Sequence, residues 1–258
     1  MKIIAGPCQH ESYDHSLMIA KHCARICAGY GFEYYFKASY DKANRTSITG
    51  VRGKGLVNTL NDFRKMKSDV PNLKILTDVH EENQISTIKK YFDDVVDVIQ
   101  IPAFLCRQTD LILSAVESGK ILNIKKGQFL APWDVHGIMS KTDGAKEVWI
   151  TERGSSFGYN SLVVDFTGLD YMLSCIPAHI VFDATHSVQK PSANGETSGG
   201  NREYVPGLTR AASALGIKNF FMEVHDDPDN APSDGANMVK LDDFEKIVQD
   251  IRLVHYNK

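Results

Sequence analysis

The feature that most constrains the fold is a repeated alternation of short β-rich runs with longer amphipathic stretches. Eight such runs lie at residues 2–6, 33–39, 73–79, 95–103, 121–127, 147–154, 179–187 and 219–225. Strands that alternate with helices pair in parallel through right-handed crossovers. No linker interrupts the units, and the 258 residues of the chain match the roughly 250 of one (β/α)8 barrel. We therefore predict a single α/β domain over residues 1–258, a TIM barrel, with an open doubly wound sheet as the alternative.

Between these runs, apolar residues recur every three or four positions. This period is typical of helices that pack one face against a sheet. The clearest helical stretches are residues 16–31, 56–70, 109–119, 209–216 and 241–258.

Composition and charge argue against several classes of protein. Hydrophobic residues make up 43% of the chain, but no stretch reaches the roughly 18 uncharged apolar residues of a membrane helix. The N-terminal segment MKIIAGPCQHES has too few apolar residues for a signal peptide, so we expect a cytoplasmic protein. A net charge of −3 argues against general nucleic-acid binding. The five cysteines are irregularly spaced, which favours free thiols or a metal ligand over a disulfide framework.

Polar residues gather where the predicted strands end. In a barrel, these ends and the loops that follow them form the active site. A single such residue could simply cap a helix, but polar residues at all eight ends predict a functional site. They are Cys8, Glu11, Lys37, Ser39, Asp78, His80, Gln100, Lys125, Lys126, Glu152, Arg153, Asp183, His186, Glu223 and His225.

Four residues near these ends could bind a metal ion. Barrel closure makes the last strand a neighbour of the first, so Cys8, His186 and Glu223 can meet on one rim. Asp234, in the loop after the last strand, can reach the same place. Sulfur, nitrogen and oxygen ligands together suit Fe(II), Zn(II) or Mn(II). The four residues are scattered along the chain, so their spacing alone leaves the site a hypothesis.

Positive charge is concentrated in residues 37–55, KASYDKANRTSITGVRGKG, which form either a solvated basic loop or a cradle for an anion. Lys125 and Arg153 lie at the ends of neighbouring predicted strands, and both side chains bind phosphate well. With Lys37 and Lys42, four cations would crowd the barrel mouth and repel one another unless anions filled it. A second phosphate could lie at Arg45, Thr46 and Ser47.

Several segments together resemble the 3-deoxy-D-manno-octulosonate 8-phosphate synthases, also called 2-dehydro-3-deoxyphosphooctonate aldolases, over nearly the whole chain. They are IAGPCQHES, FKASYDKANRTS, TDVHE, DVIQIPAFLCRQTDL, NIKKGQFLAPWD, TERGSSFGYNSLVVDF, FDATHSVQ, SGGNRE and FMEVHDDPDNAPSDG. The run KANR at residues 42–45 differs from the KPRT-like run of the related heptulosonate synthases. Cys8, in GPC, resembles the metal-dependent branch of the family, since an Asn replaces it in the other branch.

The resemblance implies a role for each of a set of residues. Cys8, His186, Glu223 and Asp234 would bind a divalent metal, Fe, Zn or Mn, and Lys42, His186 and Asp234 would be catalytic. The residues implied to bind substrate are Lys37, Asn44, Arg45, Thr46, Asp78, Gln100, Arg107, Lys125 and Arg153.

The implied reaction condenses phosphoenolpyruvate with D-arabinose 5-phosphate and water, giving 3-deoxy-D-manno-octulosonate 8-phosphate and phosphate. The product feeds lipopolysaccharide inner-core synthesis, and family members are commonly homotetramers. We expect Lys42 to have a lowered pKa suited to proton donation, because it would be desolvated among other cations. The alternatives are a heptulosonate 7-phosphate synthase that uses erythrose 4-phosphate, and a barrel that only binds sugar phosphates.

Overall fold

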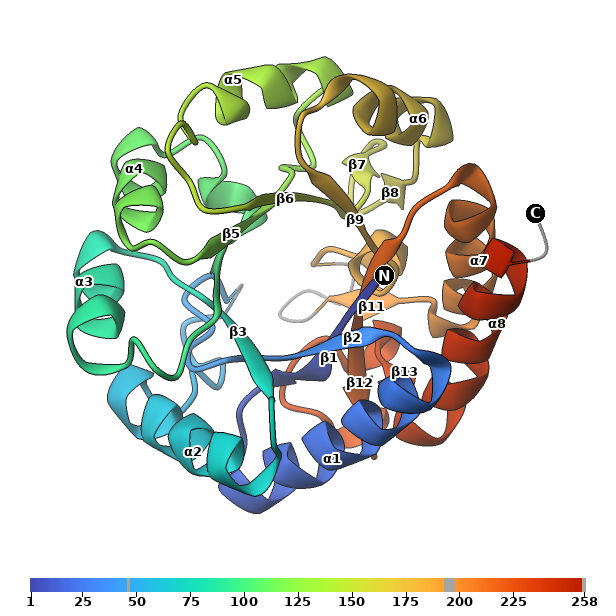
Figure 1. Ribbon diagram of the computed structural model, residues 1–258. Coiled ribbons are helices and arrows are strands. Elements are labelled where there is room, and N and C mark those ends of the chain that lie inside the picture. Colours follow the sequence, from blue (N-terminus) through green and yellow to red (C-terminus); the bar gives the residue numbers. More distant parts are fainter. Residues whose placement is uncertain (46, 193–197, 257–258) are drawn as a thin grey trace.

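Eight parallel strands close into a barrel, because β1 pairs with β2 on one side and with β12 on the other. The computed structural model describes residues 1–45, 47–192 and 198–256. The barrel strands are β1 (Lys2–Gln9), β2 (Glu33–Ser39), β3 (Lys74–Asp78), β4 (Val98–Ile101), β5 (Ile121–Lys125), β6 (Val148–Glu152), β9 (His179–Asp183) and β12 (Asn219–His225). The predicted TIM barrel is confirmed and the open sheet is wrong (Figure 1).

The α-helices form a ring outside the barrel (Figure 1). They are α1 (Tyr13–Tyr30), α2 (Leu56–Asp69), α3 (Glu82–Tyr91), α4 (Thr109–Glu117), α5 (Val135–Met139), α6 (Phe166–Cys175), α7 (Val205–Leu215) and α8 (Phe244–Tyr256). Helix α1 begins three residues earlier than predicted, because the Ser12 hydroxyl accepts a hydrogen bond from the His15 backbone N–H at 3.2 Å and caps the helix. Within the described ranges, no helix is long and apolar enough to span a bilayer.

Apolar side chains fill both faces of the barrel wall, because successive residues of a strand point to opposite sides. The larger core lies between the strands and the helices. A smaller cluster fills the barrel interior, namely Ile4, Tyr35, Leu76, Val98, Trp149, Val181 and Phe221. We call this cluster the barrel floor. All five cysteines are free, as predicted.

An irregularity in β1 carries Cys8 to the end of the barrel. Ala5 pairs with Phe36 but Cys8 pairs with Ala38, so the register shifts between them. A Cβ at Gly6 would lie 2.0 Å from the Lys37 carbonyl oxygen, so the two backbones approach this closely only with glycine there. Cys8 itself has a φ of 65°, in the left-handed region that few non-glycine residues adopt.

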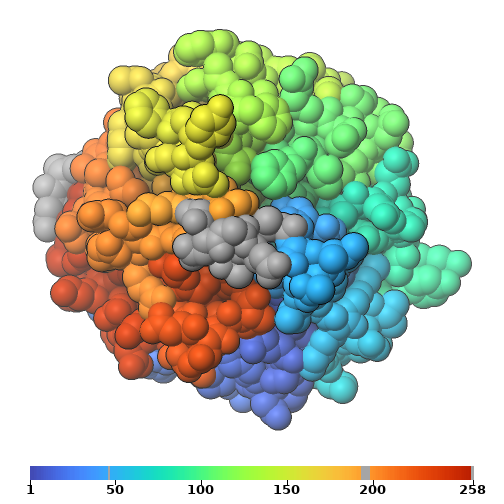
Figure 2. Space-filling view, turned by 180° about the vertical axis from the view of Figure 1, so that it is seen from behind, coloured from blue at the N-terminus to red at the C-terminus, as the bar shows by residue number. Residues whose placement is uncertain are grey.

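Loops cover the end of the barrel where the strands finish, which we call the mouth. Figure 2 shows that face, with the loop after β2 in light blue, the hairpin of β7 (Ser155–Ser156) and β8 (Leu162–Val163) in yellow, and the segment after β12 in red-orange. Arg45 joins two of these loops, because it donates hydrogen bonds to the Ser233 hydroxyl at 3.1 Å and the Pro232 carbonyl at 2.9 Å. The other short strands are β10 (Gln189–Lys190), β11 (Gly199–Gly200) and β13 (Val239–Lys240).

Candidate active site

Four predicted metal ligands meet at the mouth, supplied by β1, β12 and the segments after β9 and β12. The Cys8 thiol lies 3.4 Å from Asp234 Oδ2. His186 Nε2 lies 3.7 Å from Glu223 Oε1 and 3.9 Å from Asp234 Oδ2. One ligand atom from each of Cys8, Glu223 and Asp234 falls within 4.8 Å of the others. The structure thus brings together residues 226 positions apart in the sequence.

This group fits a divalent cation. Glu223 Oε2 is buried and has no hydrogen-bond partner among the described residues, so this oxygen can accept a further positive partner. Asp183 Oδ2 lies 2.7 Å from His186 Nδ1, which leaves Nε2 facing the other ligands. A carboxylate that accepts the N–H of a metal-binding histidine is common at metal sites. Cys8 and Asp234 both have positive φ, a strain that often occurs at functional sites.

Two lysines of the mouth are paired with carboxylates, so protein groups supply part of the negative charge that the sequence analysis assigned to bound anions. Lys37 Nζ lies 3.2 Å from Glu223 Oε1, and Lys125 forms an ion pair with Asp183. Burial lowers the pKa of Lys125, although the Asp183 carboxylate opposes this effect. Lys125 Nζ also lies 3.6 Å from the centre of the Phe221 ring, directly above the barrel floor.

Lys42 is likewise surrounded by acidic groups, contrary to the expectation of a lowered pKa. Its ammonium donates a hydrogen bond to the Ser39 hydroxyl at 3.0 Å. Burial acts to lower the pKa of Lys42, but the nearby acidic groups, led by Cys8 and Glu223, raise it above its ordinary value. The predicted lowered pKa is therefore wrong, because the acidic side chains come from strands and loops far from Lys42 in the sequence.

Arg153 is the predicted phosphate ligand with an unused donor. Its Nη2 donates to Gln189 Oε1 at 2.7 Å, while Nη1 is buried without a hydrogen-bond partner in the described part of the chain. Gln189 Nε2 in turn donates to Asp234 Oδ1 at 2.6 Å. Gln189 therefore links the guanidinium to the metal-ligand group.

The polar side chains of β3 and β4 complete the wall of the mouth. Asp78 Oδ2 lies 3.0 Å from His80 Nε2, and Asp78 Oδ1 is buried without a partner among the described residues. Burial acts to raise the pKa of Asp78, yet His80, Lys37 and Lys42 together hold it well below its usual range. Gln100 accepts a hydrogen bond from Asn123 Nδ2 at 3.0 Å.

Some predicted residues lie apart from this buried group. Asn44 and Arg107 are exposed. Arg45 is engaged by protein groups, including Gln9 Oε1 at 2.7 Å. Thr46 lies outside the described residues. Sequence analysis assigned no role to Gln189, and it assigned Asp183 only a place at a strand end. Both residues belong to the run FDATHSVQ, whose resemblance to the family could have pointed to them.

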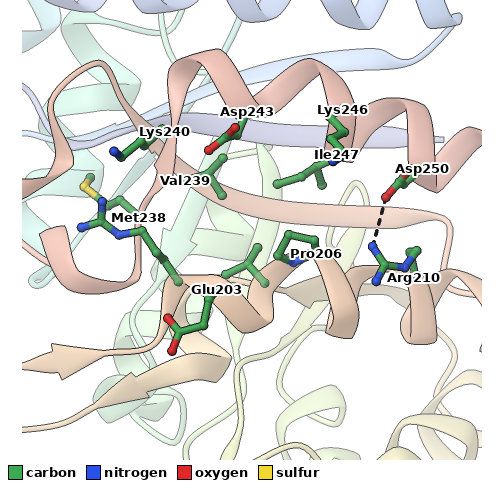
Figure 3. A pocket seen from close by; sticks show the side chains of 12 residues that line it. Glu203, Pro206, Arg210, Met238, Val239, Lys240, Asp243, Lys246, Ile247 and Asp250 are labelled. Carbon is green, nitrogen blue, oxygen red and sulfur yellow. Dashed lines mark hydrogen bonds and ion pairs between the residues drawn. The ribbon is translucent and has the colours of Figure 1, made fainter.

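A pocket away from the mouth shares none of these residues. It has a volume of about 250 Å³ and lies between α7, α8 and the segment around β13 (Figure 3). Arg210 and Asp250 form an ion pair across it at 3.1 Å. Its lining lacks the buried, convergent groups of the mouth, which remains the candidate active site.

Comparison with known proteins gives a match over nearly the whole chain. Residues 1–254 match the DAHP synthetase I family. A protein of Rickettsia typhi named 2-dehydro-3-deoxyphosphooctonate aldolase is 50% identical over 258 residues, covering 99% of this chain and 91% of that protein. One of the same name from Nitrobacter hamburgensis is 51% identical over 251 residues, covering 96% of this chain and 86% of that protein. Another, from Bradyrhizobium diazoefficiens, is 49% identical over 251 residues, with 96% and 87% covered.

Proposed function

This chain belongs to the DAHP synthetase I family, and from that premise we propose that it condenses phosphoenolpyruvate with D-arabinose 5-phosphate and water. The products are 3-deoxy-D-manno-octulosonate 8-phosphate and phosphate, and the former serves lipopolysaccharide synthesis. The observation that carries the proposal is the near full-length similarity to relatives named 2-dehydro-3-deoxyphosphooctonate aldolase. Their name specifies an eight-carbon acid, and three carbons from phosphoenolpyruvate leave five for the aldose. A four-carbon aldose, as in a heptulosonate synthase, would not give that product.

Arg153, Lys125 and Lys37 bind phosphoenolpyruvate in this proposal. The free Nη1 of Arg153 offers a buried donor to the phosphate, and a guanidinium can hold two oxygens at once. Lys125 and Lys37 lie over Phe221, at 3.6 and 5.6 Å from the ring centre, so they place positive charge at the base of the mouth. Preorganised cations of this kind stabilise the charge on a departing phosphate.

The reaction forms one carbon–carbon bond and releases phosphate. The enolpyruvate C3 adds to the aldehyde carbon of the sugar, a water oxygen adds at C2, and the bond between C2 and the phosphate oxygen breaks. Lys42 donates a hydrogen bond to the Ser39 hydroxyl at 3.0 Å, and its ammonium would stabilise the oxyanion formed from the aldehyde. Asp78 on β3 and Gln100 on β4 line the adjoining wall and orient the substrates.

We place the chain in the metal-dependent branch, with Cys8, His186, Glu223 and Asp234 as ligands. The buried Glu223 Oε2 without a partner and the mixed thiol, imidazole and carboxylate donors support this assignment. When bound, Fe, Zn or Mn would supply Lewis-acid polarisation of the aldehyde or a lowered pKa of bound water. Asp183 holds His186 in the orientation that ligation requires.

We also propose a cytoplasmic homotetramer. Exposed aromatic side chains follow β4, β5 and β6, at Phe104, Phe129, Trp133 and Phe157. Large apolar side chains of this kind are typical of surfaces that another subunit covers. Light scattering on the purified protein would give the mass of four chains, and a monomer mass would contradict the assembly.

Phosphate release from phosphoenolpyruvate tests the activity directly. We expect turnover with arabinose 5-phosphate and much slower turnover with erythrose 4-phosphate; the reverse order would contradict the substrate assignment.

Treatment with a chelator should abolish turnover, and Mn(II) or Fe(II) should restore it. Cys8→Ser should lose metal and turnover, whereas Cys175→Ser, an exposed free thiol, serves as the matched control. Full activity after complete metal removal would contradict the metal assignment but not the substrate assignment.

A further inference from the structure

A second group of metal-binding side chains lies where α1 begins beside the end of β12. Glu11, His15 and His225 each offer one ligand atom, and the three atoms lie within 4.8 Å of one another. The two imidazole rings are 4.7 Å apart, and the Asp226 carboxylate lies beside both. We infer that these residues bind a second divalent metal ion, of the Zn(II) class. The inference goes beyond the proposed function, since the catalytic ligands are different residues.

Asp226 can fix the tautomers that a metal requires. Its Oδ1 lies 2.8 Å from His15 Nε2 and 3.2 Å from His225 Nδ1. If both nitrogens carry their proton toward this carboxylate, the lone pairs of His15 Nδ1 and His225 Nε2 are left free. A carboxylate that receives the N–H of a metal-binding histidine is the usual arrangement around zinc. Asp226 would therefore orient the two histidines without binding the ion itself.

In that pair of tautomers, the two nitrogens with free lone pairs both face Glu11. Glu11 Oε1 lies 2.7 Å from His225 Nε2 and 3.7 Å from His15 Nδ1. Ligands of a tetrahedral zinc ion are roughly 3.4 Å apart, given metal–ligand distances of about 2.0–2.2 Å. The two distances from Glu11 Oε1 lie on either side of this spacing, so small side-chain movements would let the three atoms bind one ion.

His15 supplies a second, independent observation. Its Nδ1 is buried and has no hydrogen-bond partner among the described residues, because 3.7 Å to Glu11 is too long for a hydrogen bond. A buried imidazole nitrogen is seldom left without a partner, and a metal ion would satisfy it. The Glu11 side chain is 34% exposed, which gives an ion access from solvent.

A proton competes with the metal at this position. The Asp227 backbone N–H donates to His225 Nδ1 at 2.9 Å, and in that tautomer His225 Nε2–H donates to Glu11 Oε1 at 2.7 Å. A metal ion on Nε2 requires the other tautomer, with the proton on Nδ1 toward Asp226, so the hydrogen bond that Asp227 N–H donates to Nδ1 is broken. The neutral imidazole keeps its one proton, so metal binding at His225 shifts that proton from Nε2 to Nδ1 and releases none from this ring.

The position of the group indicates a structural role for the ion. Glu11 follows β1 and His225 ends β12, and these two strands pair to close the barrel. His15 belongs to the first turn of α1, so the ion would join three elements at the closing seam. An ion that binds the folded chain and not the unfolded chain raises its stability.

Zinc stoichiometry tests the proposal. The full chain is stripped with a chelator, equilibrated with Zn(II) alone, and bound zinc per chain is measured by atomic emission. We expect two ions in the wild-type protein and one fewer in His15→Gln. In the Cys8→Ser background, which removes a proposed catalytic ligand, His15→Gln should remove the remaining ion. Zn(II) should raise the Tm of Cys8→Ser by about 5 °C and leave that of the double variant unchanged.

The matched control is His22→Gln, which alters a histidine on the same helix outside the cluster. It should retain the wild-type zinc content. Equal zinc in His15→Gln and His22→Gln would overturn the proposal, with circular dichroism to establish that both variants are folded. The comparison depends only on the effect of His15, so it stands even if Cys8 binds no metal and the catalytic assignment fails.

Discussion

The two ends of the barrel carry ion pairs of the same chemistry in opposite surroundings. At the mouth, Lys37 pairs with Glu223, and the side chains are 3% and 0% exposed. At the other end, Lys74 pairs with Glu33, and the side chains are 41% and 39% exposed. The barrel floor separates the two ends. An exposed pair contributes about 0–1 kcal/mol, whereas a buried pair must first overcome the loss of hydration.

This difference indicates what each pair does. The pair at the far end connects β2 and β3 where water already solvates both groups. The pair at the mouth holds charge in a place where packing alone would favour apolar residues. Buried charge therefore distinguishes the candidate active-site end of this barrel, and charge at a strand terminus alone does not.

Removing one member of each pair should give the largest contrast. Lys37→Met leaves Glu223 buried without its ammonium partner, so we expect the free energy of unfolding to fall by about 3–5 kcal/mol. Lys74→Met should lower it by at most about 1 kcal/mol. Urea unfolding followed by circular dichroism measures both. Equal losses would show that burial does not distinguish the two ends.

Arg153→Lys probes the mouth without removing its charge. Lysine cannot hold Gln189 and a phosphate with one planar group, so kcat/KM for phosphoenolpyruvate should fall about 10- to 100-fold. Arg210→Lys, in the exposed pair with Asp250, should leave kcat/KM unchanged. Steady-state kinetics with both variants decides the matter, and an unchanged Arg153→Lys enzyme would contradict the phosphate role.

Acid should affect the mouth more than the opposite end. The folded-state pKa of Asp78 is lowered, so its contribution to stability is present above the ordinary pKa of about 4 and is lost as the pH falls below it. The free energy of unfolding of the wild-type protein should therefore fall between pH 6 and pH 3 by about 1–2 kcal/mol more than that of Asp78→Asn. The pKa of Glu33 is also lowered, but this carboxylate is partly exposed, so Glu33→Gln should show a smaller change. A pH series of urea titrations measures both slopes, and identical slopes would count against the contrast.

The smallest expected effect is at the far end. Tyr35→Phe removes the hydrogen bond from the phenol to Glu33 at 3.0 Å but keeps the ring that packs 4.9 Å from Trp149. We expect a loss of about 0.5–1.5 kcal/mol in unfolding free energy. A loss above about 3 kcal/mol in urea unfolding would mean that polar groups here are as critical as those of the mouth.

The strands could be predicted because each is a short apolar run bounded by turns. Their ends could not always be predicted. The run 95–103 suggested a long strand, but β4 extends only from Val98 to Ile101, because Pro102 has no N–H for the ladder. Residues 95 and 96 instead form backbone hydrogen bonds to Phe92 and belong to the preceding turn.

The barrel rule predicted where the candidate site lies, but it did not predict the electrostatics of that site. Sequence order places Lys42 among cations, whereas the fold places it beside Cys8, Glu223 and Asp234, whose chain positions are remote. The partners of a charged side chain depend on which loops meet, and one sequence does not specify that. Gln189 was unassigned for the same reason, since its two partners come from other segments.

The seam between the first and last barrel strands also sets the order in which the chain can become active during its synthesis. Cys8 leaves the ribosome early, and Asp234 follows 226 residues later. At about 5–20 residues per second, the thiol spends about 10–45 s without the groups that enclose it. During that interval Cys8 is an unshielded sulfur, open to oxidants and to stray metal ions. Closure of the barrel is thus the event that protects this thiol.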